Sequence, residues 1–176
     1  MKKFICIAAL AAFAAVAEDK PAMPKPAEEL KVEKWFVGTW SCKGKRNAGP
    51  MGPPGDVAVK LTMKMELAGS WLNVEVASTQ GPMKGEVSEG YATWDPASKT
   101  HLRFAFNAGG SWSRLATPGW DGDKIVFDGE LMAGGQKVPL RHTITRKGDN
   151  EFQSVWESAG RTLEDGSCTR AAAKKK

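Results

Sequence analysis

The chain has 176 residues, 41% of them hydrophobic and 26% charged, and its formal net charge is +5. This length suffices for one domain with its own core and is short for two. The excess positive charge comes from the ends, from Lys2 and Lys3 and from Arg170 with the lysines at 174–176, so the chain between them is near neutral. Because nucleic-acid-binding domains gather Lys and Arg on one face, the composition argues against a nucleic-acid partner.

The first 17 residues have the pattern of a secretory signal peptide. Lys2 and Lys3 precede an apolar run over 4–16, and residues 15–17 form a small-x-small cleavage pattern. The run is shorter than the roughly 20 residues that a membrane span needs, and no second run of that length follows. We therefore expect an exported protein, periplasmic or extracellular, with no transmembrane segment in the mature chain. An uncleaved N-terminal anchor is the alternative.

Behind the predicted signal peptide (1–17) the sequence divides into three parts. Residues 18–26 hold three prolines and several charges, which is typical of an extended linker. Residues 27–169 carry the folded domain, and residues 170–176 form a basic tail that we expect to be disordered. At the start of the domain, acidic residues precede lysines over 27–36, which predicts a short helix with Leu30, Lys34 and Val37 on one face.

From Gly38 onward, apolar residues recur at every second position. The longest case runs over 57–67, and shorter ones lie within 72–76, 102–106, 125–131 and 138–144. Such alternation predicts strands with one buried face. Turn signals rich in Gly, Pro, Asp and Asn separate the runs. Many short strands without helical crossovers predict an all-β fold, an antiparallel up-and-down β-barrel of about ten strands, with a sandwich as the alternative.

The cysteines bear on this choice. Signal-peptide cleavage removes Cys6 and leaves Cys42, in the first predicted strand, and Cys168, in the last. In an up-and-down barrel these two strands are hydrogen-bonded neighbours. Because export permits disulfides, we expect a Cys42–Cys168 bridge, with two buried thiols as the alternative. No further Cys or His stands at zinc-site spacing, so a metal site is not expected.

Between the first two predicted strands, residues 49–55 have a Gly-x-y spacing. The segment is too short for a collagen-like triple helix, so we expect a mobile loop. Its position would also allow it to act as a flap over a barrel mouth.

Catalytic motifs are absent from the sequence, which lacks the nucleophile elbow, the zinc-protease motif and the phosphate-binding loop. The two histidines differ in their predicted surroundings. His101 lies opposite Leu102 and Phe104 on its strand, so we expect it at the surface. His142 alternates with Leu140, so we expect its imidazole inside the barrel. There it could be a hydrogen-bonded core residue, a polar contact for a ligand or an axial haem ligand.

The segment Trp35-Phe36-Val37-Gly38-Thr39-Trp40-Ser41-Cys42, preceded by Pro26 to Leu30, resembles the opening of the bacterial domain-of-unknown-function 1579 family. Residues 67–72, 90–95 and 117–123 extend the resemblance, which spans about Pro26 to Cys168. It implies a calycin-like barrel, similar to lipocalins, in which Trp40 packs near the closed end. Nitrobindin-like haem proteins open similarly. For that analogy only His142 can be carried over as a ligand, and the fuller glycine-aromatic pattern is missing.

The inward faces of the predicted strands are rich in Met and aromatic residues, which line a pocket in a barrel of this size. We expect a lumen lined by Met63, Met65, Phe104, Phe127, His142 and Trp156. The function that follows is non-covalent binding of a small, mainly hydrophobic molecule, without catalysis, cofactor or metal. The alternatives are a barrel without a pocket, with a structural or protein-interaction role, and a haem-binding barrel.

Overall fold

The computed structural model describes residues 25–172. The predicted signal peptide, most of the predicted linker and the terminal lysines lie outside these residues. Three short helical segments are present: η1 (Glu28–Leu30), α1 (Lys31–Lys34) and η2 (Leu67–Gly69). The strands are β1 (Gly38–Arg46), β2 (Gly55–Glu66), β3 (Trp71–Gln80), β4 (Val87–Asp95), β5 (Thr100–Asn107), β6 (Trp112–Thr117), β7 (Trp120–Asp121), β8 (Lys124–Ala133), β9 (Gln136–Arg146), β10 (Glu151–Ser158) and β11 (Arg161–Arg170).

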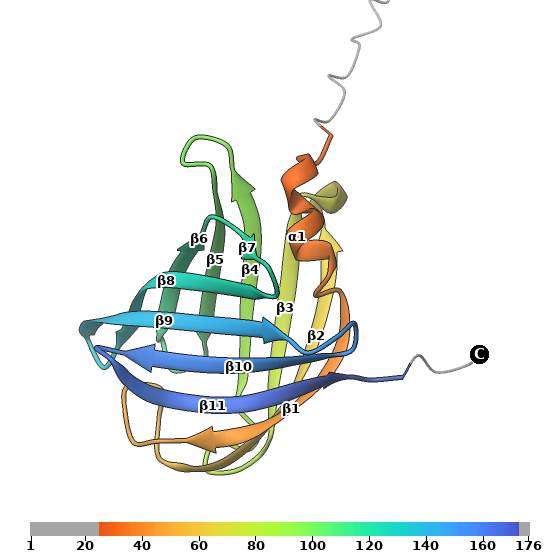
Figure 1. Cartoon of the computed structure of the whole chain (residues 1–176). Coiled ribbons are helices and arrows are strands. Elements are labelled where there is room, and N and C mark those ends of the chain that lie inside the picture. Colours follow the sequence, from red (N-terminus) through yellow and green to blue (C-terminus); the bar gives the residue numbers. More distant parts are fainter. Residues whose placement is uncertain (1–24, 173–176) are drawn as a thin grey trace, which may run out of the picture.

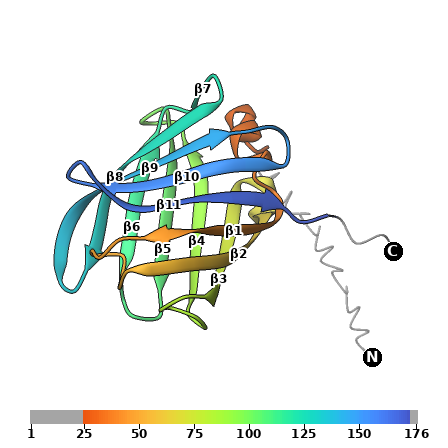
Figure 2. The same cartoon turned by 60° about the horizontal axis from the view of Figure 1, so that its bottom comes forward.

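These strands form one antiparallel sheet that closes on itself. The order is β6-β5-β4-β3-β2-β1-β11-β10-β9-β8-β7, and an additional pairing of β6 with β8 joins the two ends. The result is a closed barrel of ten strands, to which the two-residue β7 adds as an extra strand on β8. Figures 1 and 2 show that β8 to β11 form one wall of the barrel and that β3 to β5 belong to the opposite wall. The predicted all-β barrel of about ten strands is confirmed.

Strands β1 and β11 meet as neighbours, as the cysteines predict. In the register of this pair, Cys42 stands directly opposite Cys168, and the two are joined by a disulfide. The bridge links residues 126 positions apart in the sequence. It therefore fastens the first strand of the barrel to the last, and the predicted pairing is confirmed.

Tight curvature is permitted by glycines within the strands. A Cβ atom on Gly129 of β8 would collide with the main-chain oxygen of Arg114 in β6. A Cβ on Gly166 of β11 would lie 2.6 Å from the main-chain oxygen of Lys43 in β1. Glycine in a strand interior commonly marks such a close approach of backbones. Both positions lie at the pairings that close the barrel.

The N-terminal helical segments η1 and α1 lie against one end of the barrel (Figure 1). Leu30 and Glu33 of these segments and Phe36, two residues after α1, are buried, each at most 2% exposed. The predicted face is therefore only partly right, because Lys34 is exposed and Val37 is 37% exposed. The spacing of the buried residues is three, as suits a short segment that begins as a 3-10 helix.

An aromatic cluster fills this end of the barrel and fixes Trp40. The Trp40 indole is fully buried, and its Nε1 donates a hydrogen bond of 2.8 Å to the carbonyl oxygen of Phe36. The Arg170 guanidinium lies 4.0 Å from the centre of the Trp40 ring and donates to the carbonyl oxygens of Trp35 and Val37. Arg170 is the last residue of β11, so the strand includes the first residue of the predicted tail.

The inward and outward faces of β5 are the reverse of those predicted. His101 is only 2% exposed, and its Nδ1 lies 3.3 Å from an oxygen of the fully buried Glu33 carboxylate. The prediction of a surface histidine is therefore wrong. Arg103 and Ala105 share its inward face, and Phe106, on the other face, is 46% exposed. The pattern predicted the strand correctly and its phase incorrectly.

An aromatic patch on the outer wall explains this reversal. The Phe106 ring stacks on Tyr91 of β4, with ring centres 6.5 Å apart, and Tyr91 contacts Trp71 of β3 edge to face. Trp112, opposite Phe106 in β6, is 39% exposed. Aromatic residues outside the barrel therefore produce an alternating pattern that resembles a core-facing one.

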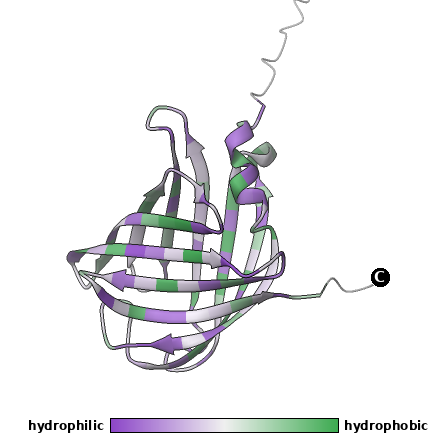
Figure 3. Ribbon diagram, viewed as in Figure 1, coloured by the Kyte–Doolittle hydropathy of each residue, from purple (hydrophilic) through white to green (hydrophobic). Residues whose placement is uncertain are grey.

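Hydrophobic and hydrophilic residues alternate along most strands (Figure 3). Within residues 25–172, no helix is long and apolar enough to cross a membrane.

We predict that replacing both Cys42 and Cys168 by serine lowers the free energy of unfolding by about 4 kcal/mol, because the bridge closes a loop of more than a hundred residues and restricts the unfolded chain. Urea denaturation of the oxidised wild type and the double variant measures this difference. An unchanged midpoint would show that the bridge contributes nothing to stability.

Candidate functional site

The barrel encloses a cavity of about 310 Å³. This volume is at the lower end of the range for small-molecule pockets. Its wall is mainly aliphatic and comes from the inward positions of β2, β3, β8 and β9. The aliphatic residues of this wall are Val57, Val59, Leu61, Met63, Val74, Val76, Leu131, Leu140 and Ile144.

Three of the six predicted lumen residues line this cavity with inward-facing side chains, namely Met63, His142 and Trp156. Phe127 faces inward but is fully buried in the core, and Met65 packs against the same core. Phe104 borders the cavity. Because it follows the inward-facing Arg103, strand alternation directs its ring to the outer wall. The predicted set therefore divides between the cavity, the core and the outside.

Arg103 of β5 projects into the barrel and was missed by sequence reasoning. Its guanidinium carbon lies 3.9 Å from the centre of the Phe127 ring, and Nη1 lies 3.1 Å from His142 Nδ1. Its Nε has no hydrogen-bond partner, and Arg103 forms no ion pair with a carboxylate of residues 25–172. Burial lowers the pKa of Arg103, while the more distant Glu33 opposes this shift.

His142 is held between Arg103 and Ser154. Because a guanidinium can only donate, His142 Nδ1 accepts from Arg103, and the ring proton is therefore on Nε2. Nε2 lies 2.8 Å from Ser154 Oγ and donates to it. The imidazole also stacks on Trp156, with ring centres 3.6 Å apart. Burial, and secondly the charge of Arg103, hold the pKa of His142 well below its ordinary value. His142 is consequently neutral at neutral pH.

These contacts fix the direction of the hydrogen bonds that join Arg103, His142 and Ser154. Arg103 donates to His142, His142 donates to Ser154, and the Ser154 hydroxyl proton is left to donate to another group. Arg103 and Ser154 both line the cavity. At this place in the lumen, Arg103 and Ser154 therefore present hydrogen-bond donors to anything bound there.

The haem hypothesis does not fit this arrangement. An axial ligand needs a free imidazole nitrogen, but both nitrogens of His142 contact protein atoms. As regards other metal sites, residues 25–172 contain no group of three or more His, Cys, Asp or Glu side chains placed to hold a metal ion.

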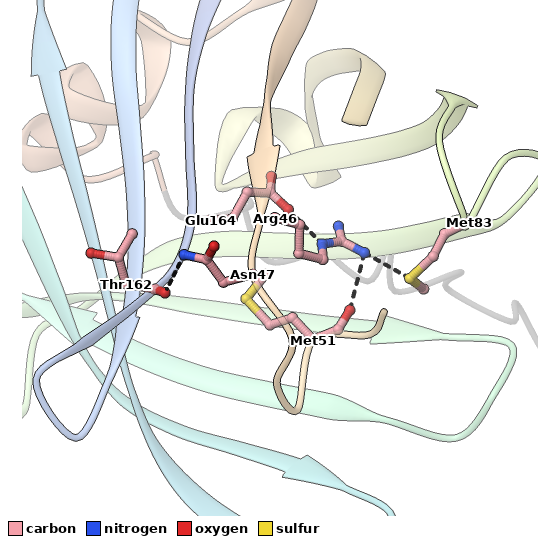
Figure 4. A network of polar contacts seen from close by, with 6 residues as sticks. All are labelled: Arg46, Asn47, Met51, Met83, Thr162 and Glu164. Atoms are coloured by element: carbon pink, nitrogen blue, oxygen red, sulfur yellow. Dashed lines mark hydrogen bonds and ion pairs between the residues drawn. The ribbon is translucent and has the colours of Figure 1, made fainter. Parts of the chain in front are cut away.

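A second polar network lies at the other end of the cavity (Figure 4). Arg46 Nε lies 2.7 Å from the Glu164 carboxylate, joining β1 to β11. Arg46 Nη1 donates to the carbonyl oxygen of Met51 at 3.1 Å and contacts Met83 Sδ at 2.7 Å. Met51 belongs to the β1–β2 loop and Met83 to the β3–β4 loop, and both border the cavity. Arg46 thus connects the β1–β2 and β3–β4 loops to this end of the barrel. We call this end the mouth.

The sequence did contain a signal for this network. Cys42, Gly44 and Arg46 stand at alternate positions of β1, and their partners in β11 are Cys168, Gly166 and Glu164. Once the disulfide is placed on the inner face, alternation puts Arg46 and Glu164 on that face too.

Comparisons with known proteins support the fold. No family model matches the chain, and no curated protein is similar to it. Rv2717c from M. tuberculosis has a similar structure, with a TM-score of 0.61 and 13% sequence identity over 84% of this chain and 100% of that one. A redesigned β-barrel and a designed fluorescence-activating β-barrel are more distant, with TM-scores of 0.44 and 0.45 at 14% and 9% identity. They cover 80% and 78% of this chain and 96% and 95% of their own.

We predict that His142 stays neutral, with its proton on Nε2, when the pH falls below about 6.5. Because the unfolded chain takes up a proton there and the folded chain does not, folding stability should decrease as the pH falls from about 6.5 towards the folded-state pKa. Nitrogen-15 NMR of the imidazoles measures the titration, and the chain has only two histidines.

The matched control is His142→Gln, whose amide can accept from Arg103 and donate to Ser154 without titrating. It should remove this part of the pH dependence of stability. An imidazolium spectrum for His142 at about pH 6 would contradict the assignment.

Proposed function

We propose that this protein binds a small, mainly apolar molecule non-covalently in the lumen of its barrel. The observation that carries the proposal is an aliphatic cavity of about 310 Å³ that also contains a few convergent polar groups. This combination is typical of ligand sites. Transfer of an apolar molecule from water to the aliphatic wall is favourable by about 25 cal/mol per Å² of buried surface.

The cavity also distinguishes this proposal from a barrel with only a structural role. Protein interiors are close-packed and contain few voids larger than a water molecule. Here a volume of about 310 Å³ inside the barrel is left unfilled by side chains. A barrel selected only for stability would fill this space with larger side chains at the cavity wall.

The predicted signal peptide favours binding outside the cytoplasm. The Cys42–Cys168 bridge supports this location, because disulfides persist in the periplasm and outside the cell. The resemblance to the domain-of-unknown-function 1579 family suggests the same location. We therefore propose a periplasmic or extracellular binding protein.

The ligand enters at the mouth, where Arg46 contacts Glu164 and the two loops. Arg46 and Glu164 have side chains only 9% and 17% exposed, and the contacts of Arg46 hold the loops that carry Met51 and Met83. We propose that these two loops form a lid and that the ion pair keeps it closed. This is the flap function expected for the β1–β2 loop.

Filling the lumen tests the proposed function. Val76→Trp adds a large side chain at an inward position of β3 that lines the cavity. We expect the variant to lose at least tenfold in affinity for Nile red, measured by fluorescence titration. Ala77→Trp, at the next position and on the outer face of the same strand, is the matched control and should bind as the wild type does. Equal loss in both variants, or no binding by the folded wild type, would refute lumen binding.

A variant that weakens the contacts of the lid tests whether the ligand enters at the mouth. Glu164→Gln keeps the shape of the side chain and removes its charge, so the hold on Arg46 weakens. We expect both the association and dissociation rates of Nile red to rise severalfold in stopped-flow fluorescence, with a smaller change in the equilibrium constant. Asp128→Asn, which breaks the exposed pair with Arg141, is the control and should change neither rate. Unaltered rates in Glu164→Gln would argue against a lid at this end.

A further inference from the structure

Resting on the proposed function, we propose that the ligand is an aliphatic carboxylic acid, bound with its carboxylate against Arg103 and its hydrocarbon chain along the wall formed by β2 and β3. This statement goes beyond binding of an apolar molecule because it assigns the charge, the orientation and the residue that selects the ligand.

The first argument is the charge of Arg103. A guanidinium remains protonated in proteins, so the lumen contains a fixed positive charge. An enclosed cation without a paired anion is costly. Its neighbours are the Phe127 and Phe36 rings, with centres 3.9 and 5.6 Å from its central carbon, and the neutral His142. The rings attract the cation by their faces and neutralise none of its charge.

Glu33 is the carboxylate whose charge acts on Arg103. It belongs to α1, is fully buried, and lies 3.3 Å from His101 Nδ1, and neither of its oxygens makes a hydrogen bond. Its charge reaches Arg103 only at longer range, since the two do not form an ion pair. At the mouth, Glu164 is paired with Arg46. Neither acid therefore occupies the face of Arg103 that is turned to the cavity.

The second argument is the direction of the hydrogen bonds. Arg103 Nε has no partner, and the Ser154 hydroxyl has a proton left to donate after accepting from His142. Both nitrogens of His142 are occupied. The head of the ligand must therefore be an acceptor. A carboxylate meets this need and matches the planar fork of a guanidinium.

The number of charges selects a carboxylate over a phosphate. Arg103 is one cation, and the other arginine that lines the cavity, Arg46, is already paired with Glu164. One unpaired cation balances one negative charge. A phosphate monoester carries nearly two at neutral pH and would keep an excess negative charge in a largely apolar space.

The aliphatic wall defines the rest of the ligand. Val59 and Leu61 of β2 and Val74 and Val76 of β3 line the cavity. A hydrocarbon chain along this wall would remove apolar surface from water on both partners. The cavity volume is small for a ligand pocket, which favours a chain of medium length.

Calorimetric titration with octanoate and 1-octanol tests the inference, because the two probes share a chain length and differ in the head group. We expect the wild type to bind octanoate about tenfold or more tightly than octanol. Arg103→Met, which keeps the length of the side chain, should lower octanoate affinity at least tenfold and leave octanol affinity nearly unchanged. Arg114→Met, on the outer face of β6, should behave as the wild type does.

The stability of the unliganded variants separates a binding role from a structural one. If Arg103 is an unpaired charge kept for a ligand, Arg103→Met should unfold at the same or a higher temperature than the wild type. If Arg103 mainly holds the fold, the variant should unfold earlier and lose both probes equally, which would overturn the inference. Arg103→Lys keeps the charge and loses the planar fork, and it should retain part of the preference for octanoate.

The outcomes distinguish the inference from the proposed function. If Nile red binds in the lumen but octanoate binds no better than octanol, the carboxylate assignment fails and lumen binding stands. If the folded wild type binds none of the three probes, the proposed function itself fails.

Discussion

The pairing of β6 with β8, which closes the sheet into a barrel, is the constraint on which the rest of the structure depends. Closure gives every barrel strand an inner face and fixes the space inside. Strand curvature at the closing pairs requires Gly129 and Gly166, because a Cβ at either position would meet the backbone of the neighbouring strand. The disulfide fastens β1 to β11 in the same ring of strands. Helical segments η1 and α1 then cover one end, and two loops held by Arg46 cover the other.

Enclosure determines the chemistry of the interior. A side chain that is buried on an inner face is shielded from bulk water, so each polar group there is expected to find a partner inside the barrel. Most do so: Arg46 pairs with Glu164, and His142 bonds at both nitrogens. Among the described residues that line the cavity, Arg103 is the one with a buried polar atom, Nε, that has no hydrogen-bond partner, and its guanidinium forms no ion pair with a carboxylate of residues 25–172. Arg103 borders the aliphatic cavity. Its unpaired charge matches the anionic head of an amphipathic ligand, and the apolar wall matches the hydrocarbon chain.

Alternation and turn signals were sufficient to predict the all-β class, about ten strands and the Cys42–Cys168 bridge, because these depend on local pattern and on the adjacency of the first and last strands. The phase of β5 was not predictable in the same way. His101 and Arg103 face inward while Phe106 faces the outer aromatic patch, and the rule that apolar residues face the core gave the opposite result. Arg46 and Glu164 could have been placed from their alternation with the cysteines. The volume of the cavity depends on how all ten strands close together, which no single stretch of sequence encodes.

A crystal structure of the protein with octanoate bound tests the central claim most directly. The account predicts that the carboxylate lies within hydrogen-bonding distance of the Arg103 guanidinium and that the chain extends along β2 and β3 towards the mouth. Octanoate found only on the outer aromatic patch, or in the lumen with its carboxylate turned away from Arg103, would contradict it.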